Sequence, residues 1–349
     1  MLYGRPVGRP GATGIATASL FASLAAVLAT SAVATACSPA SPSPAAHAAA
    51  VAAWDAGAAS ALESFGRQIP VMAHQEQQWE AGGLSTAAFT TALGRSESVI
   101  DEAAVAVRGL PPYPGQPDVD RLYAASVQLY QQVPRLQAAA PGLGAGLLRT
   151  QVVLLSDRVR ELADRTFDQG RVLTDQGLVP AGVPAGTKLQ LPLEVPDWVA
   201  EGLAPGPPLA AAPPPPAAPF PPLRQGNRPT ESSSAWAKAV AGLGAPRPDD
   251  VAATLADPEA VPDLRAEADR LQAAAAAVYA LPDPSSRRGR ERSDRLRLAW
   301  LIEAEACRAA EAADLAGATP GAAHVLAGTA PALLAVARAV AAGESLPGF

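Results

Sequence analysis

Histidine and carboxylate side chains are the first groups to examine for chemistry in this chain, because together they bind metals and move protons. The sequence has three histidines, His47, His74 and His324. None lies four residues from another histidine or three residues after a glutamate, the spacings that place two ligands on one helix face. His74 and Glu80 are six residues apart and do not share a face. We expect a surface position for His74, a partly buried or boundary position for His324 and no metal site, with a ferritin-like metal-handling bundle as the alternative.

Carboxylates recur on one predicted helix, residues 286–315, which carries Glu303, Glu305 and Glu311. A di-metal bundle needs such acids to face inward with histidines beside them, and the histidines are missing here. We therefore expect these three acids to lie on a solvated face. The chain also has no phosphate-binding Gly-x-x-x-x-Gly-Lys loop and no Gly-x-Ser-x-Gly elbow. The sequence predicts a non-catalytic protein without a cofactor, and an enzyme with an unrecognised site is the remaining alternative.

Residues 10–54 contain no Asp, Glu, Lys or Arg. Arg5 and Arg9 precede this stretch, and an apolar run occupies roughly residues 15–33. The residues that follow the run and precede Cys37 are small: Ala34, Thr35 and Ala36. A basic start, an apolar middle and small residues before a cleavage point are typical of a secretory signal peptide. We expect residues 1–36 to be such a peptide.

The residues around Cys37 resemble the lipobox of bacterial lipoproteins, in which small residues precede a cysteine that receives lipid and becomes the mature N-terminus. This sequence has Ala34 where that family usually has leucine. The resemblance implies that Cys37 carries diacylglycerol and a fatty acid such as palmitate, which would anchor the protein at the extracytoplasmic face of the cell membrane. Ordinary cleavage, which releases a secreted protein, is one alternative. An uncleaved span is the other, since the apolar run approaches the ~20 residues that cross a bilayer.

Arginine is concentrated in residues 287–297, which hold six arginines and two acidic residues. Positive side chains at a helix start oppose the helix dipole, so this cluster is unexpected as a purely structural element. Guanidinium groups bind phosphate in a bidentate way. The candidate contacts to anionic headgroups or to another anionic envelope component are Arg287, Arg288, Arg290 and Arg292. The alternative is a solvated loop and helix start.

The rest of the chain divides by pattern into a tether, two helical segments and a linker. Residues 37–45 are rich in proline and serine, which indicates a tether. In residues 46–178 apolar side chains recur at spacings of four and three, which predicts about four amphipathic helices. Residues 179–231 lose this pattern and contain four consecutive prolines, so they predict a linker. The helical pattern returns in residues 232–349. We expect an all-α protein of two antiparallel bundles, each of about four helices.

Charge and composition narrow the class of partner. The formal net charge is −6, and loss of Arg5 and Arg9 with the signal peptide would make it about −8. An acidic protein of this kind is not expected to bind nucleic acid. The membrane, through the anchor, and another envelope protein remain the expected partners. Only Lys188 and Lys238 among the 27 basic residues are lysine, and with abundant alanine, proline and glycine this indicates a GC-rich genome such as an actinobacterial one.

Overall fold

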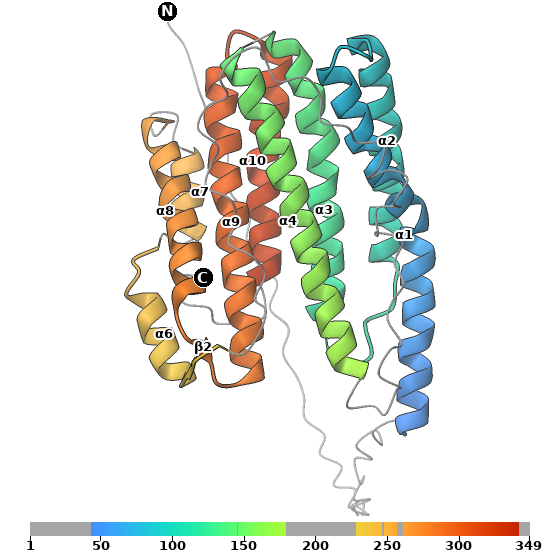
Figure 1. The fold of residues 1–349 in the computed structure, drawn as a ribbon, viewed down its shortest axis with the longest axis vertical. Helices are drawn as coiled ribbons and strands as arrows, with labels where there is room; N and C mark the ends of the chain where they lie inside the picture. The colour runs from blue at the N-terminus through green and yellow to red at the C-terminus, as the bar shows by residue number, and fades with distance from the viewer. Residues whose placement is uncertain are drawn as a thin grey trace, which may run out of the picture. The chain divides into compact units, whose positions relative to one another are not determined.

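The computed structural model describes residues 43–116, 118–144, 146–178, 228–245, 248–256 and 261–341, and these residues are mostly helical (Figure 1). The prediction of an all-α protein is confirmed. The α-helices in these ranges are α1 (Pro44–Glu80), α2 (Thr86–Arg108), α3 (Asp118–Ala139), α4 (Leu147–Leu178), α6 (Ser233–Ala241), α7 (Pro248–Ala256), α8 (Val261–Ala280), α9 (Arg287–Leu315) and α10 (Pro320–Ala341), with a 3-10 turn η1 (Ala140–Leu143). All of them belong to one compact unit, Pro42–Phe349. The expected signal peptide and most of the expected linker lie outside the described residues.

Serine side chains define where four of the helices begin. Ser43, Ser85, Ser232 and Ser286 precede α1, α2, α6 and α9, and each hydroxyl accepts a hydrogen bond from the backbone N–H three residues later. This contact satisfies one of the N–H groups that a helix start leaves without a partner. Proline is also tolerated at a first helical position. α1 therefore begins at Pro44, inside the segment expected to be tether.

Helices from the two halves of the chain pack against each other. α3 and α4 lie side by side, and α9 lies between α8 and α10. Across the halves, α3 contacts α10 and α4 contacts α9, as Figure 1 also shows. The expected division into two bundles is therefore not confirmed. Apolar faces of α3 and α4 are covered by helices from the second half, because covering them removes more apolar surface from water than either half achieves alone.

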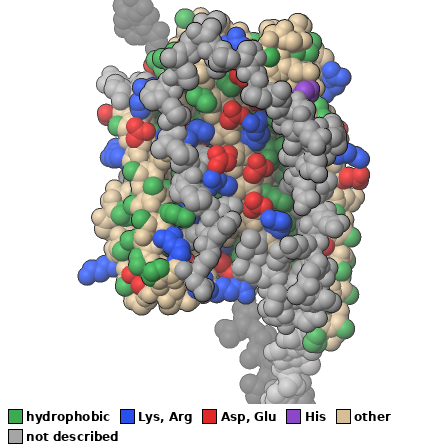
Figure 2. Space-filling view, in the orientation of Figure 1, with side chains coloured by type: hydrophobic (Ala, Val, Ile, Leu, Met, Phe, Trp, Pro, Cys, Tyr) green, Lys and Arg blue, Asp and Glu red, His purple; other side chains and the backbone are tan. Residues whose placement is uncertain are grey.

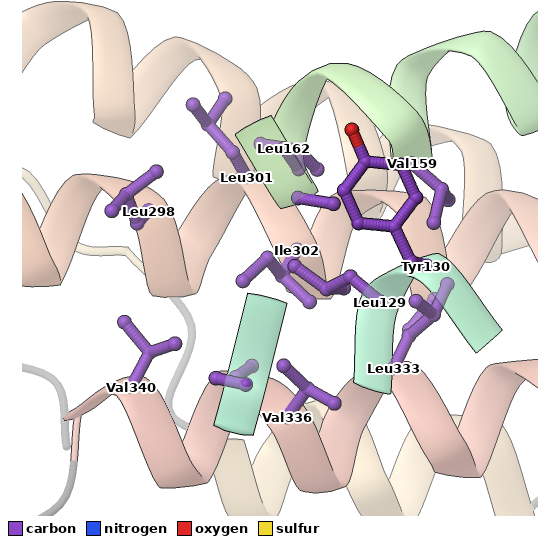
Figure 3. Packing of buried hydrophobic residues seen from close by; sticks show 14 of the residues in the cluster. Leu129, Tyr130, Val159, Leu162, Leu298, Leu301, Ile302, Leu333, Val336 and Val340 are labelled. Atoms are coloured by element: carbon purple, nitrogen blue, oxygen red, sulfur yellow. The ribbon is translucent and has the colours of Figure 1, made fainter. Parts of the chain in front are cut away.

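The core runs without interruption through this contact between the halves. Figure 3 shows Leu129 and Tyr130 of α3 and Leu162 of α4 close to apolar side chains of α9 and α10. The labelled side chains from the second half are all buried: Leu298, Leu301, Ile302, Leu333, Val336 and Val340. Burying a side chain of this size stabilises a fold by roughly 1.5–3 kcal/mol. The halves are thus joined by hydrophobic packing as well as by the polar contacts described below.

A short strand pair fixes the start of α9. β1 (Thr230–Glu231) and β2 (Asp283–Pro284) pair in parallel, which connects the residues before α6 to the residues before α9. Gly289 in the first turn of α9 packs tightly against this pair. A Cβ atom at Gly289 would lie 2.6 Å from the Cβ of Pro284 and 2.8 Å from the Oγ of Ser286. Glycine is therefore the residue that lets α9 start directly behind β2.

α10 is long and apolar enough to cross a membrane, judged by length and composition alone. In the most apolar stretch of α10, 44% of the residues are buried inside the unit. Its buried side chains include Leu326, Leu333 and Val340, which face the other helices of the core. A buried helix in the core of a globular protein can have the same length and apolar composition as a membrane-spanning helix, so these two properties alone are weak evidence that α10 crosses a membrane.

Candidate functional site

The predicted chemistry-bearing residues fall into three groups in the structure. Cys37 lies outside the described residues. His47 and His74 lie on α1 and are 27 positions apart, and His324 lies on α10. Among the described residues, no group of three or more His, Cys, Asp or Glu side chains could hold a metal ion. The arginines of residues 287–297 form the third group.

The structure places the four candidate arginines at the start of α9 but gives them different roles. Arg287 is 44% exposed in its side chain and pairs with Glu291 one turn later, with 2.9 Å between Nε and Oε1. Arg288 is exposed. Arg290 donates to the backbone carbonyls of Ser285 at 3.1 Å and Pro284 at 3.4 Å, so it holds the loop before α9. Arg292 is half-buried.

The last two arginines of the cluster are buried in structural contacts. Arg295 donates to Asp118 at the start of α3, with 2.5 Å between the nitrogen and the carboxylate oxygen. Arg297 pairs with Asp294 at 3.3 Å and lies 4.6 Å from the ring centroid of Tyr279. A guanidinium at that distance from an aromatic face is attracted by it. The arginine cluster therefore has a buried structural part and an exposed part at its N-terminal end.

Glu305, expected on a solvated face, is instead fully buried where α4, α8 and α9 meet. Its Oε1 accepts from Arg158 of α4, at 2.8 Å from Nε, and from Arg308, at 2.6 Å. Both arginines also donate to the amide oxygen of Gln272 on α8, at 3.1 and 2.7 Å. The prediction was wrong because α4 covers this face of α9. The network gives the contact between the halves a specific geometry.

Glu303 was also expected in solvent and is also fully buried. No donor among the described residues forms a hydrogen bond with either of its carboxylate oxygens. Burial, together with the charge of Glu267 on α8, raises the pKa of Glu303 to about 8 against the opposing effect of Arg338 on α10. Burial, together with the charges of Glu267 and Glu303, raises the pKa of the neighbouring Cys307 thiol to about 12. Cys307 is therefore a protonated, buried thiol with little nucleophilic character.

A second acidic cluster lies between α1 and α4. Arg160 of α4 donates to Glu76 of α1 at 3.3 Å and also pairs with Asp157. The hydroxyl of Tyr130 on α3 donates to Asp164 on the next turn of α4. Burial, and then the charge of Asp157, raises the pKa of Glu76 to about 8. Burial likewise raises the pKa values of Asp157 and Asp164.

Glu76 of this α1–α4 cluster can hold a proton near neutral pH, since burial and Asp157 raise its pKa to about 8. Perturbed carboxyl groups are common at sites of proton transfer, and structural ion-pair networks also contain them. Acidic and basic side chains also alternate down the middle of the face shown in Figure 2. The cluster could not be predicted from the sequence, because no spacing pattern along the chain shows that Glu76 faces α4.

Comparisons with known proteins do not assign a function to this geometry. No family model, curated protein or solved structure significantly matches the chain. Function is therefore inferred from the residues and their placement.

Proposed function

We propose that this protein is an exported lipoprotein, held at the extracytoplasmic face of the cell membrane through Cys37. In this proposal the helical body is a non-catalytic binding or scaffolding module for another component of the envelope. The single observation that carries the proposal is the sequence up to Cys37, with its basic start, apolar run and small residues. Among the described residues the first helix, α1, begins at Pro44, seven positions after Cys37.

A scaffolding role, rather than catalysis, fits the use that the body makes of its charged side chains. The network of Arg158, Glu305, Arg308 and Gln272 joins α4, α8 and α9, and the pair of Arg295 and Asp118 joins α9 to α3. These groups hold helices in register and are largely shielded from solvent. Charged groups used in this way are not available to a substrate.

The lipid anchor is tested by the intact mass of protein extracted from the membranes of an actinobacterial expression host. We expect a chain that starts at Cys37 and carries the mass of a diacylglycerol and one or more acyl chains. Cys37→Ala removes the acceptor sulfur, and this variant should lose both the added mass and the membrane association. An unmodified Cys37 N-terminus in the culture medium, or a chain that retains residues 1–36, would refute the proposal.

One observation favours a second candidate function, an acid–base enzyme that uses the α1–α4 cluster. Glu76 has a raised pKa and lies beside Asp157 and Arg160, so a proton donor and a charge-stabilising group are neighbours. A panel of chromogenic ester, phosphate and glycoside substrates tests this candidate on wild type and Glu76→Gln. Turnover by wild type that is lost in a folded Glu76→Gln variant would favour the enzyme. Equal behaviour of the two proteins on every substrate would count against it.

A further inference from the structure

The starts of α1 and α9 lie at the same end of the helical body. The indole N–H of Trp54, near the start of α1, donates to the carbonyl of Pro111 at 2.9 Å, in the loop that leads into α3. Asp118, the first residue of α3, accepts from Arg295 near the start of α9 at 2.5 Å. Both helices are therefore fixed beside the start of α3, and Figure 1 shows the three starts at one end.

Both helices also extend beyond the start of α3. Pro44 precedes Trp54 by ten residues, and Arg287 precedes Arg295 by eight. At 1.5 Å per residue these segments are about 15 and 12 Å long. The first residues of α1 and α9 consequently lie beyond the start of α3 at this end of the body.

Charge is distributed along α9 in the opposite way to that favoured by its dipole. Its first eleven residues hold six arginines and two acids, whereas residues 298–315 hold one arginine, Arg308, and four acids. Cations stabilise a helix at its C-terminus and destabilise it at its N-terminus. α1 contributes no repulsive charge nearby, because its first charged residue is Asp55. The start of α9 thus presents exposed basic side chains, whereas the acids of the same end are half-buried or buried: Asp118, Asp120, Glu231 and Asp283.

We propose that this end faces the membrane and that Arg287 and Arg288 bind the headgroups of anionic phospholipids beside the lipid anchor. The inference rests on the proposed function, because the anchor brings this end to the bilayer. Residues 38–43 separate Cys37 from Pro44, and a fully extended chain of that length reaches at most about 25 Å. An anchor at Cys37 would therefore keep the start of α1 within about 25 Å of the lipid surface.

The exposed side chains select Arg287 and Arg288 from the larger cluster. The Arg287 side chain is 44% exposed although it pairs with Glu291, and Arg288 is exposed. Arg290 is occupied with backbone carbonyls. Electrostatic attraction to an anionic surface acts within about 8 Å at physiological salt, so only the outermost charges contribute fully. Contact through α9 as well as through the anchor would fix the orientation of the body on the membrane.

The experiment uses the chain from residue 37 onward with Cys37→Ser, which keeps every described helix and carries no lipid. Its sedimentation is measured with phosphatidylcholine vesicles that contain phosphatidylglycerol, and with pure phosphatidylcholine vesicles. In this background we compare the parent chain with Arg287→Gln/Arg288→Gln. The matched control is Arg67→Gln/Arg265→Gln, which removes the same charge from exposed, ion-paired arginines on α1 and α8. Arg265 pairs with Glu311 near the far end of α9, 2.8 Å away.

We expect salt-sensitive binding of the parent chain to the anionic vesicles and none to the neutral ones. The Arg287→Gln/Arg288→Gln variant should bind about twenty-five-fold more weakly, from roughly five-fold for each arginine near an anionic surface. The control should bind like the parent. Undiminished binding by the first variant, or an equal loss in the control, would overturn the inference. The intact-mass measurement at Cys37 is independent of this result, so the failure of the anchor and the failure of the arginine contact are distinguishable.

Discussion

Replacing Glu303 with glutamine should change how the stability of this protein depends on pH. In the folded protein the carboxyl group is fully buried and its pKa is raised from 4.5 to about 8. The unfolded chain releases this proton near pH 4.5, whereas the folded state keeps it up to about pH 8. The folded state therefore binds more protons between these values, and its free energy of unfolding falls as the pH rises through that window. Glutamine cannot ionise, so the variant lacks this contribution.

The size of the effect follows from the shift. One pKa unit corresponds to 1.36 kcal/mol, so ionisation of Glu303 lowers the unfolding free energy of wild type by about 5 kcal/mol at pH 8 and above, relative to low pH. At pH 6 the same relation gives about 2 kcal/mol. The charged groups that face Glu303 are Glu267 on α8 and Arg338 on α10, with the thiol of Cys307 one turn away. A glutamine amide without a partner costs about 1–3 kcal/mol at every pH. The change with pH is therefore the quantity to measure.

Urea unfolding of wild type and Glu303→Gln at several pH values between 5 and 9 measures this difference. The stability of the variant relative to wild type should increase steadily up to about pH 8 and then stay constant. Glu63→Gln is the control for the loss of an exposed carboxyl group, because the Glu63 side chain is 60% exposed. Parallel curves for wild type and Glu303→Gln would refute the reasoning, since they would show that Glu303 is ionised in the folded protein over the whole range.

Three further substitutions test the packing and the polar contacts. Arg158→Met should lower the unfolding free energy by about 3 kcal/mol, because buried Glu305 would lose one of its two arginine partners, Arg158, and retain Arg308. A variant as stable as wild type in urea would contradict this. Gly170→Ala should cost about 1–3 kcal/mol in the same assay, since its Cβ would lie 2.9 Å from two ring carbons of Tyr123. Gly94→Ala meets open space inside helix α2 and should raise the melting temperature, with a gain of about 1 kcal/mol; a lower melting temperature would contradict this.

The apolar face of each long helix could be predicted from the sequence. In α4, the side chains of Val152, Leu155, Val159 and Leu162 follow spacings of three and four, and the structure buries all of them. This worked because the helix period alone determines which side chains share a face. The period does not say which other helix covers that face. The contacts of α4 with α9 and of α3 with α10 were therefore missed.

The burial of Glu303 and Glu305 was missed although the sequence carries a signal for it. Residues 298–307 are apolar on every side of the helix except at these two glutamates. A helix that is apolar all round is surrounded by other elements, so its polar residues are buried too. Its many alanines allow neighbours to approach from several directions. The expectation of a solvated face rested on the missing histidines and did not take the apolar neighbours of the two acids into account.

The pairing of α4 with α9 has a consequence for how the protein must be made. Arg158 and Glu305 are 147 positions apart in the chain, and Asp118 and Arg295 are 177 apart. While the polypeptide is synthesised from its N-terminus, the apolar sides of α3 and α4 emerge long before α9 and α10 exist to cover them. Contacts that span such distances form slowly, and exposed apolar helices in the interval favour aggregation. Until α9 and α10 are available, the first half therefore lacks the helices that cover its apolar faces in the folded protein.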